Sequence, residues 1–169
     1  LKLSNTAGLG AAGQAISLNG GTLDLATDAT VNAYNATVGG TVTINSNKAT
    51  ASSAGITHVL GTLSIGAQTL TVNTGANVSS GSARVSFGAI TLTGAATLSP
   101  GTADLEMTST QTGNFKLTKS GADTLRKTTA DWTLANDFEV TTGTYDANGR
   151  ATTVTGLATV SGGTYSAST

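Results

Sequence analysis

Acidic residues are the first side chains in this sequence that could do chemistry, because polysaccharide cleavage needs two carboxylates that flank one bond. Asp104 and Glu106 alternate with Leu105, so both are expected on the outer side of one strand. Asp24 has a similar setting but lies too far along the chain to cooperate with them. We therefore expect solvated surface carboxylates, no catalytic residue and no enzyme activity.

Histidine and cysteine offer little chemistry. His58 is the single histidine, and with no nucleophile or metal-ligand pattern beside it we expect a structural or exposed side chain. The absence of cysteine excludes disulfides, thiolate metal sites and cysteine nucleophiles. The sequence also lacks the G-K-[ST] motif of phosphate-binding loops, the H-E-x-x-H motif of zinc-binding helices and the G-x-S-x-G motif of hydrolase nucleophiles. We expect no cofactor and no metal.

Basic side chains gather in one part of the chain. Half of the eight Lys and Arg residues lie within residues 116–127, and they form the candidate interaction patch: Lys116, Lys119, Arg126 and Lys127. This patch could attract an anionic glycan or a partner subunit, whereas the alternative is an ordinary solvated set on both sides of a strand. The net charge of −1 gives no general attraction to nucleic acid or an anionic membrane.

Threonine raises a further alternative, because Thr-x-Thr pairs repeated on a flat solenoid face can organise water and bind ice. Such pairs occur at Thr41 and Thr43, at Thr69 and Thr71, and at Thr91 and Thr93. Under a repeat of about 20 residues the pairs do not persist in register over consecutive coils. We therefore interpret them as threonines that suit the outer face of a strand.

Many short strands must position these side chains. Apolar residues make up 38% of the chain and charged residues only 10%, while Thr and Gly are abundant, so strands punctuated by turns are favoured over helices. Stretches such as GGTLDL and GGTVTI recur. Aligned on a glycine, they give anchors that step by 19 to 22 residues: Gly21, Gly40, Gly61, Gly81, Gly101, Gly121, Gly143 and Gly163. A period this constant is typical of a solenoid.

Apolar residues follow each anchor at fixed distances. The positions two and four residues later are apolar or aromatic in all but one case, and a polar residue lies between them. This alternation predicts a strand with one buried face, repeated in the same register in every coil. Arg84 should then lie beside Asp104, and Tyr145 beside Tyr165. For Asp123, the exception, we expect a local bulge that turns it outward rather than a buried functional carboxylate.

The sequence thus predicts an all-β, single-stranded parallel β-helix, a β-solenoid of about eight coils of about 20 residues. Residues 1–169 should form one domain, which we interpret as a fragment of a longer repetitive protein because it begins at LKLSN and ends at YSAST.

The stretch FKLTKSGADTL, residues 115–125, resembles the Leu-Thr-Lys-x-Gly-x-x-Thr-Leu core of the autotransporter-associated β-strand repeat. GTLDL and GTYSAST look like the sequence around such repeats, whereas RKTTADWTLANDF departs from the usual continuation. The resemblance implies a right-handed β-helix passenger of a bacterial secreted or surface-displayed, adhesin-like protein. The family is not defined by catalytic residues, so it adds none here.

We therefore expect an extracellular or bacterial cell-surface location and a structural or adhesive role as a stiff surface rod, spacer or fibre-forming unit. The expected partners are neighbouring coils or copies of the same protein, with a surface glycan as an alternative. Nucleic acid and membrane insertion of this segment are not expected. The alternative function is a carbohydrate-binding or polysaccharide-cleaving β-helix, for which the aromatic candidates are Tyr34, Trp132, Tyr145 and Tyr165.

Overall fold

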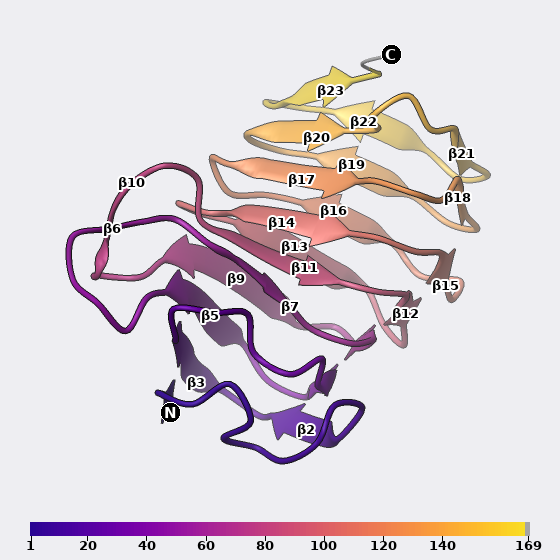
Figure 1. Cartoon of the computed structure of the whole chain (residues 1–169). Coiled ribbons are helices and arrows are strands. Elements are labelled where there is room, and N and C mark those ends of the chain that lie inside the picture. Colours follow the sequence, from indigo (N-terminus) through magenta and orange to yellow (C-terminus); the bar gives the residue numbers. More distant parts are fainter. Residues whose placement is uncertain (168–169) are drawn as a thin grey trace.

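The computed structural model describes residues 1–167, and within this range it contains strands and no helix. All paired strands are parallel, and they stack along one axis from the N-terminal to the C-terminal end (Figure 1). The predicted all-β parallel β-helix is therefore confirmed. The right-handed winding that the resemblance implies stays a prediction.

Three sides form the solenoid. Sheet A holds eight strands: β1 (Lys2–Leu3), β3 (Gly21–Ala26), β5 (Val42–Asn47), β9 (Thr69–Thr74), β13 (Ala96–Pro100), β16 (Leu117–Lys119), β19 (Phe138–Val140) and β22 (Ala158–Val160). Sheet D holds six: β7 (Thr57–Val59), β11 (Arg84–Phe87), β14 (Asp104–Met107), β17 (Thr124–Lys127), β20 (Thr144–Asp146) and β23 (Thr164–Ser166).

The third side consists of sheets B and E. Sheet B holds β2 (Ala15–Leu18), β4 (Asn35–Val38), β8 (Leu63–Ile65), β12 (Ile90–Leu92) and β15 (Gln111–Thr112). Sheet E continues this side with β18 (Trp132–Leu134), which contacts β15, and β21 (Thr152–Val154). From β5 onward, each coil passes from sheet A to sheet D, then to sheet B or E, and back to sheet A.

Coil length is not constant, and this corrects the predicted register. In sheet A, Leu70 pairs with Val42 on one side and with Leu98 on the other, which makes two successive coils longer than predicted. Thr74 and Thr102, bonded across the second of these long coils, are 28 residues apart. Later coils are shorter, since Arg84 and Asp104, bonded across adjacent coils, are 20 residues apart. The predicted repeat therefore holds in the C-terminal half and fails in the middle of the N-terminal half.

The extra residues of the two long coils leave the solenoid at the corner between sheets A and D. They form two adjacent loops that pair through a small sheet C, made of β6 (Ser53–Ala54) and β10 (Val78–Ser80), on the left of Figure 1. The Asn77 side-chain amide donates to the Lys48 carbonyl at 2.7 Å and so joins the two loops.

These loops explain why the glycine anchors do not form one column. Each loop lengthens its coil by about one side of the triangle, so the next anchor falls one corner earlier. Gly40 precedes a strand of sheet A, Gly61 a strand of sheet B, and Gly81 a strand of sheet D. From Gly81 onward the anchors stay at the corner before sheet D.

The core runs through the coils as columns of inward side chains. In sheet D, one column follows the register His58, Val85, Leu105, Leu125, Tyr145 and Tyr165. The two predicted neighbour pairs are confirmed: Arg84 pairs with Asp104, and the rings of Tyr145 and Tyr165 lie 5.4 Å apart. The apolar side chains of the last coil are the most exposed of these columns: Leu157 is 67% and Val160 53% exposed.

Candidate functional site

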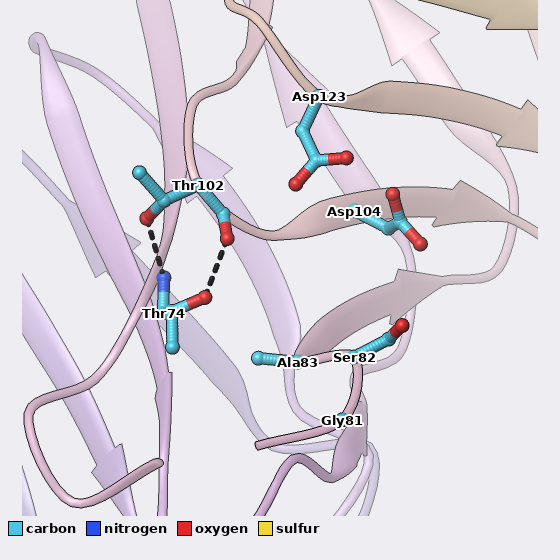
Figure 2. A pocket seen from close by; sticks show the side chains of 7 residues that line it. All are labelled: Thr74, Gly81, Ser82, Ala83, Thr102, Asp104 and Asp123. Carbon is cyan, nitrogen blue, oxygen red and sulfur yellow. Dashed lines mark hydrogen bonds between the residues drawn. The ribbon is translucent and has the colours of Figure 1, made fainter. Parts of the chain in front are cut away.

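A polar hollow of about 190 Å³ lies where the protruding loops stop and the short coils begin. Three consecutive coils supply its walls, all at the corner between sheets A and D (Figure 2). The lining residues are Thr74 at the end of β9, Gly81, Ser82 and Ala83 before β11, Thr102 before β14, Asp104 at the start of β14, and Asp123 before β17. The long second loop thus creates the hollow, because no equivalent loop covers the coil that follows.

Hydrogen bonds between two threonines fix one edge of the hollow. The Thr74 amide donates to Thr102 Oγ1 at 3.0 Å, and Thr74 Oγ1 donates to the Thr102 carbonyl at 2.5 Å (Figure 2). This reciprocal pair joins adjacent coils at the point where the backbone leaves sheet A. These two hydrogen bonds fix the spacing of the two coils at this edge of the hollow.

Two carboxyl groups give the hollow its chemistry. Arg84 lies 3.1 Å from Asp104 and 3.4 Å from Glu106, so one guanidinium serves both carboxyl groups. Burial raises the pKa of Asp123, and the neighbouring Asp104 carboxyl raises it further, whereas the Thr124 amide, 3.0 Å from Asp123 Oδ1, opposes this rise. A carboxyl group with a raised pKa beside a second carboxyl group is a pairing from which general acid and base chemistry can be built.

The position of Asp123 differs from the one that the repeat predicts. Asp123 lies outside the core, as expected. The repeat aligns Asp123 with Tyr145, whereas in the structure Leu125 pairs with Tyr145 and Asp123 lies at the corner before β17. Sequence reasoning missed its approach to Asp104. The available signal was that Asp123 follows Asp104 by almost one coil of about 20 residues, which brings both to the same corner of adjacent coils.

The candidate interaction patch does not form one surface. Lys116 is outward and pairs with Glu139 at 2.6 Å, and Arg126 pairs with Asp146 at 2.8 Å. Lys119 and Lys127 are both fully buried, with 0% exposure, because they share the inward parity of Leu117 and Leu125 on their strands. Two of the four basic side chains therefore cannot meet a glycan or a partner from outside.

Lys119 instead holds a corner of the solenoid together. Its Nζ donates to the carbonyls of Ser120 at 2.8 Å, Gly121 at 2.6 Å and Thr142 at 2.8 Å, so it joins its own turn to the turn of the next coil. Burial lowers the pKa of Lys119 to about 8, which still leaves the ammonium charged at neutral pH. Lys127 similarly donates to the Ala151 carbonyl.

His58 is a core residue. It is fully buried in the sheet D column, and its Nε2 lies 2.9 Å from the Asn47 carbonyl oxygen. Burial lowers its pKa. Among residues 1–167, no group of three or more His, Cys, Asp or Glu side chains is placed to hold a metal ion.

The aromatic candidates for carbohydrate stacking are mostly inside the solenoid. Tyr34, Trp132 and Tyr145 are at most 1% exposed, and only Tyr165, at 41%, is accessible. Tyr34 accepts a hydrogen bond from the Leu9 amide, and the Trp132 ring nitrogen donates to the Ser109 carbonyl at 2.9 Å. The Tyr145 hydroxyl lies 2.9 Å from the Thr152 hydroxyl. All three rings can therefore be buried with their polar atoms hydrogen-bonded, and they are not available to a sugar outside the solenoid.

Comparison of the chain with family models, with curated proteins and with solved structures gives no match. Within residues 1–167 there is no helix that could cross a membrane.

Proposed function

We propose that this chain is a stiff β-helical segment of a bacterial secreted or surface-displayed protein, which spaces or displays other parts of that protein. The observation that carries the proposal is the unbroken backbone pairing of sheet A, in which each of the eight strands is bonded to the next. With a strand spacing of about 4.8 Å, this sheet alone extends about 34 Å along the axis.

Stiffness follows from how the coils are held. From β7 onward, sheets A and D pair every coil with the next, whereas the third side is interrupted between β15 and β18, which are in contact without backbone pairing. Bending the rod would therefore have to stretch hydrogen bonds in sheet A or sheet D, or crowd the side chains between them. The structure also needs no cysteine, because stacked columns of Leu, Val and Ile provide the cohesion. A rod of this kind suits an extracellular position.

The last coil offers a place where the rod can be extended. Strands β21, β22 and β23 each end their sheet, and their free edges point the same way along the axis (Figure 1). Free strand edges pair readily with further strands. Further coils, or another copy of the protein, are therefore the partners that fit this end.

Spin labels can test the stiffness. The chain has no cysteine, so Ser17→Cys on β2 and Thr153→Cys on β21 create unique attachment points on exposed positions of the same side. Six strand spacings separate them, or roughly 29 Å between backbones. We expect one narrow distance distribution in the folded chain and a broad one in urea. A broad distribution without urea would contradict the rod.

A display experiment tests the role itself. The chain is placed between a surface anchor and an epitope on bacterial cells, and an unstructured Gly/Ser segment of the same length serves as the control. We expect the rod to hold the epitope at one fixed height above the surface, whereas the flexible segment gives a spread of heights. Equal spreads for the two would count against a spacer.

The hollow favours a second candidate function, binding or cleavage of a polysaccharide by Asp104 and Asp123. Its test is release of reducing ends from a panel of polysaccharides by the wild type, Asp104→Asn and Asp123→Asn. Glu106→Gln is the control, because Glu106 also pairs with Arg84 but does not line the hollow. Loss of cleavage in both Asp variants alone would establish this function; no release by the wild type would remove cleavage.

A further inference from the structure

The outer face of sheet A carries hydroxyl groups in two columns. One column follows the pairing of Thr69, Thr97 and Thr118, and the other follows Thr22, Thr43, Thr71 and Ser99. Thr41 lies two residues before Thr43, and Ser120 two residues after Thr118, so the same registers extend both columns. We call the set formed by Thr41, Thr43, Thr69, Thr71, Thr97, Ser99, Thr118 and Ser120 the hydroxyl grid.

The register of the grid differs from the one predicted from the sequence, in which the Thr-x-Thr pairs do not align over consecutive coils. A constant repeat of about 20 residues places the Thr-x-Thr pairs at positions 41–43 and 69–71 out of register. The long coils instead take 28 residues, as the bonded Thr74 and Thr102 show, and Thr43 therefore pairs directly with Thr71. Two hydroxyls per strand persist over four consecutive strands, β5, β9, β13 and β16, with Thr41 and Ser120 just beyond strand ends.

The hydroxyls of the grid are free. Within the described part of the chain, none of these eight hydroxyls makes a hydrogen bond to another protein group. Threonines elsewhere behave differently: the hydroxyls of Thr74, Thr108 and Thr141, for example, donate to backbone carbonyls of neighbouring coils. The hydrogen-bonding capacity of the grid is thus wholly available to whatever lies outside sheet A.

The support beneath the grid is rigid and regular. Between the two columns run the inward residues Val42, Leu70, Leu98 and Lys119, all of them at most 2% exposed. Strands repeat about every 4.8 Å, and alternate residues along a strand are roughly 6.6 Å apart. Six of the eight members are threonines, whose β-branched side chains have few rotamers. Hydroxyl groups therefore repeat in two directions over the whole grid, with methyl groups beside all of them except Ser99 and Ser120.

Charged residues border the two ends of the grid but not its centre. No member of the grid is charged, and the residues beside the first column just before β9 and β13 are the small Ala67 and Ala95. Lys116 takes the same position before β16 and pairs with Glu139. At the other end, Asp24 of β3 lies two residues beyond Thr22 of the second column. The protruding loops leave at the corner with sheet D and do not interrupt the strands of sheet A. Glu139 ends the first column at the next coil.

Protein partners and single sugars are a poor match for such a face. Protein interfaces rely on aromatic and Arg anchors, and sugars are held by stacking on exposed rings, neither of which the grid supplies. A ligand that itself repeats in two directions would meet all eight hydroxyls at once. We propose that the hydroxyl grid binds ice, with the hydroxyls anchoring ordered water and the methyl groups packing against it. This activity does not depend on the proposed spacer function.

The test uses ice directly. We expect the wild type to shape growing ice crystals, to produce a gap between melting and freezing, and to inhibit recrystallisation. Thr71→Lys and Thr97→Lys place a long charged side chain at the centre of the grid and should abolish most of that gap. Thr133→Lys and Thr153→Lys, at exposed outer positions of sheet E, are the matched controls and should retain it.

Thermal unfolding by circular dichroism would confirm that all four variants fold, because each substitution lies on an outer face. Absence of ice shaping by the wild type would overturn the proposal, as would equal losses in the grid and control variants. Binding to crystalline cellulose or chitin in place of ice, sensitive to the same two grid variants, would also overturn it by assigning the face to a polysaccharide.

Discussion

Replacing Lys119 by methionine should destabilise the solenoid even though the new side chain is more apolar than the old one. The methionine keeps the length of the stem and its place in the sheet A column between Leu98 and Val140. It removes the ammonium that three carbonyls share. The matched control is Lys116→Met, the same change at an outward lysine of the same segment.

The size of the effect follows from two opposing contributions. A carbonyl that loses a charged donor and is kept from water costs about 1–3 kcal/mol, and three carbonyls are affected. Against this, the methionine avoids the desolvation of an ammonium, which is worth several kcal/mol. We expect the loss of the carbonyl partners to outweigh the relief by about 2 kcal/mol. Lys116→Met, which removes a partly exposed ion pair, should cost at most about 1 kcal/mol.

Urea unfolding followed by circular dichroism measures both variants, and its pH dependence adds a second criterion. The pKa of Lys119 is lowered to about 8 in the folded chain, whereas the unfolded value is 10.5. Between these values the unfolded chain binds more protons, so the wild type should gain stability relative to Lys119→Met as the pH rises from about 8 to about 10.5. The reasoning is refuted if Lys119→Met is as stable as the wild type at pH 7, or if the difference does not change over this pH range.

Three further predictions concern other parts of the solenoid. Because burial lowers the pKa of His58, the unfolded chain takes up a proton first as the pH falls, so stability should drop below about pH 6.5 more steeply in the wild type than in His58→Leu; urea midpoints from pH 5 to 7.5 would detect this. Gly121→Ala should lower the free energy of unfolding by about 3 kcal/mol or more, because Gly121 has a φ of +77° and a Cβ there would collide with the Pro100 carbonyl. Gly13 has a φ of +81° but open space around it, so Gly13→Ala should cost only about 1 kcal/mol by urea unfolding. Leu105→Ala, in the middle of the sheet D column, should cost about 2–5 kcal/mol by thermal or urea unfolding, and a loss below about 1 kcal/mol would contradict a tightly packed interior.

The sequence predicts the strand register of the C-terminal half of this fold. For the N-terminal half it predicts the type of fold but not the length of the coils. Alternating residues and a constant period place Arg84 beside Asp104 and Tyr145 beside Tyr165, because no extra residues intervene there. In the two long coils the extra residues form loops that resemble strands in composition, as VSSGSA does. The glycine spacing therefore stays nearly constant where the true coil is longer.

The buried lysines show a different limit. The parity of Leu117 and Lys119 on one strand indicates an inward lysine, but charge argues for an outward one, and the pattern alone cannot decide between them. The Lys119 side chain is inward because, at a corner of the solenoid, carbonyl groups of two coils have no strand partners and accept hydrogen bonds from its ammonium. Such partners depend on where neighbouring turns meet in space, and a single sequence does not specify that meeting point.

Both candidate surfaces of this molecule depend on the same irregularity. Because the extra residues of the two long coils leave through one corner, they build a wall over the hollow that contains Asp104 and Asp123. Because they leave only through that corner, sheet A continues beneath them without a bulge, and threonines one long coil apart come into register. Shortening the loop at residues 75–82 to the length of the later coils should therefore open the hollow and leave the hydroxyl grid in place. Loss of both together would show that the loop supports the sheet rather than only covering the corner.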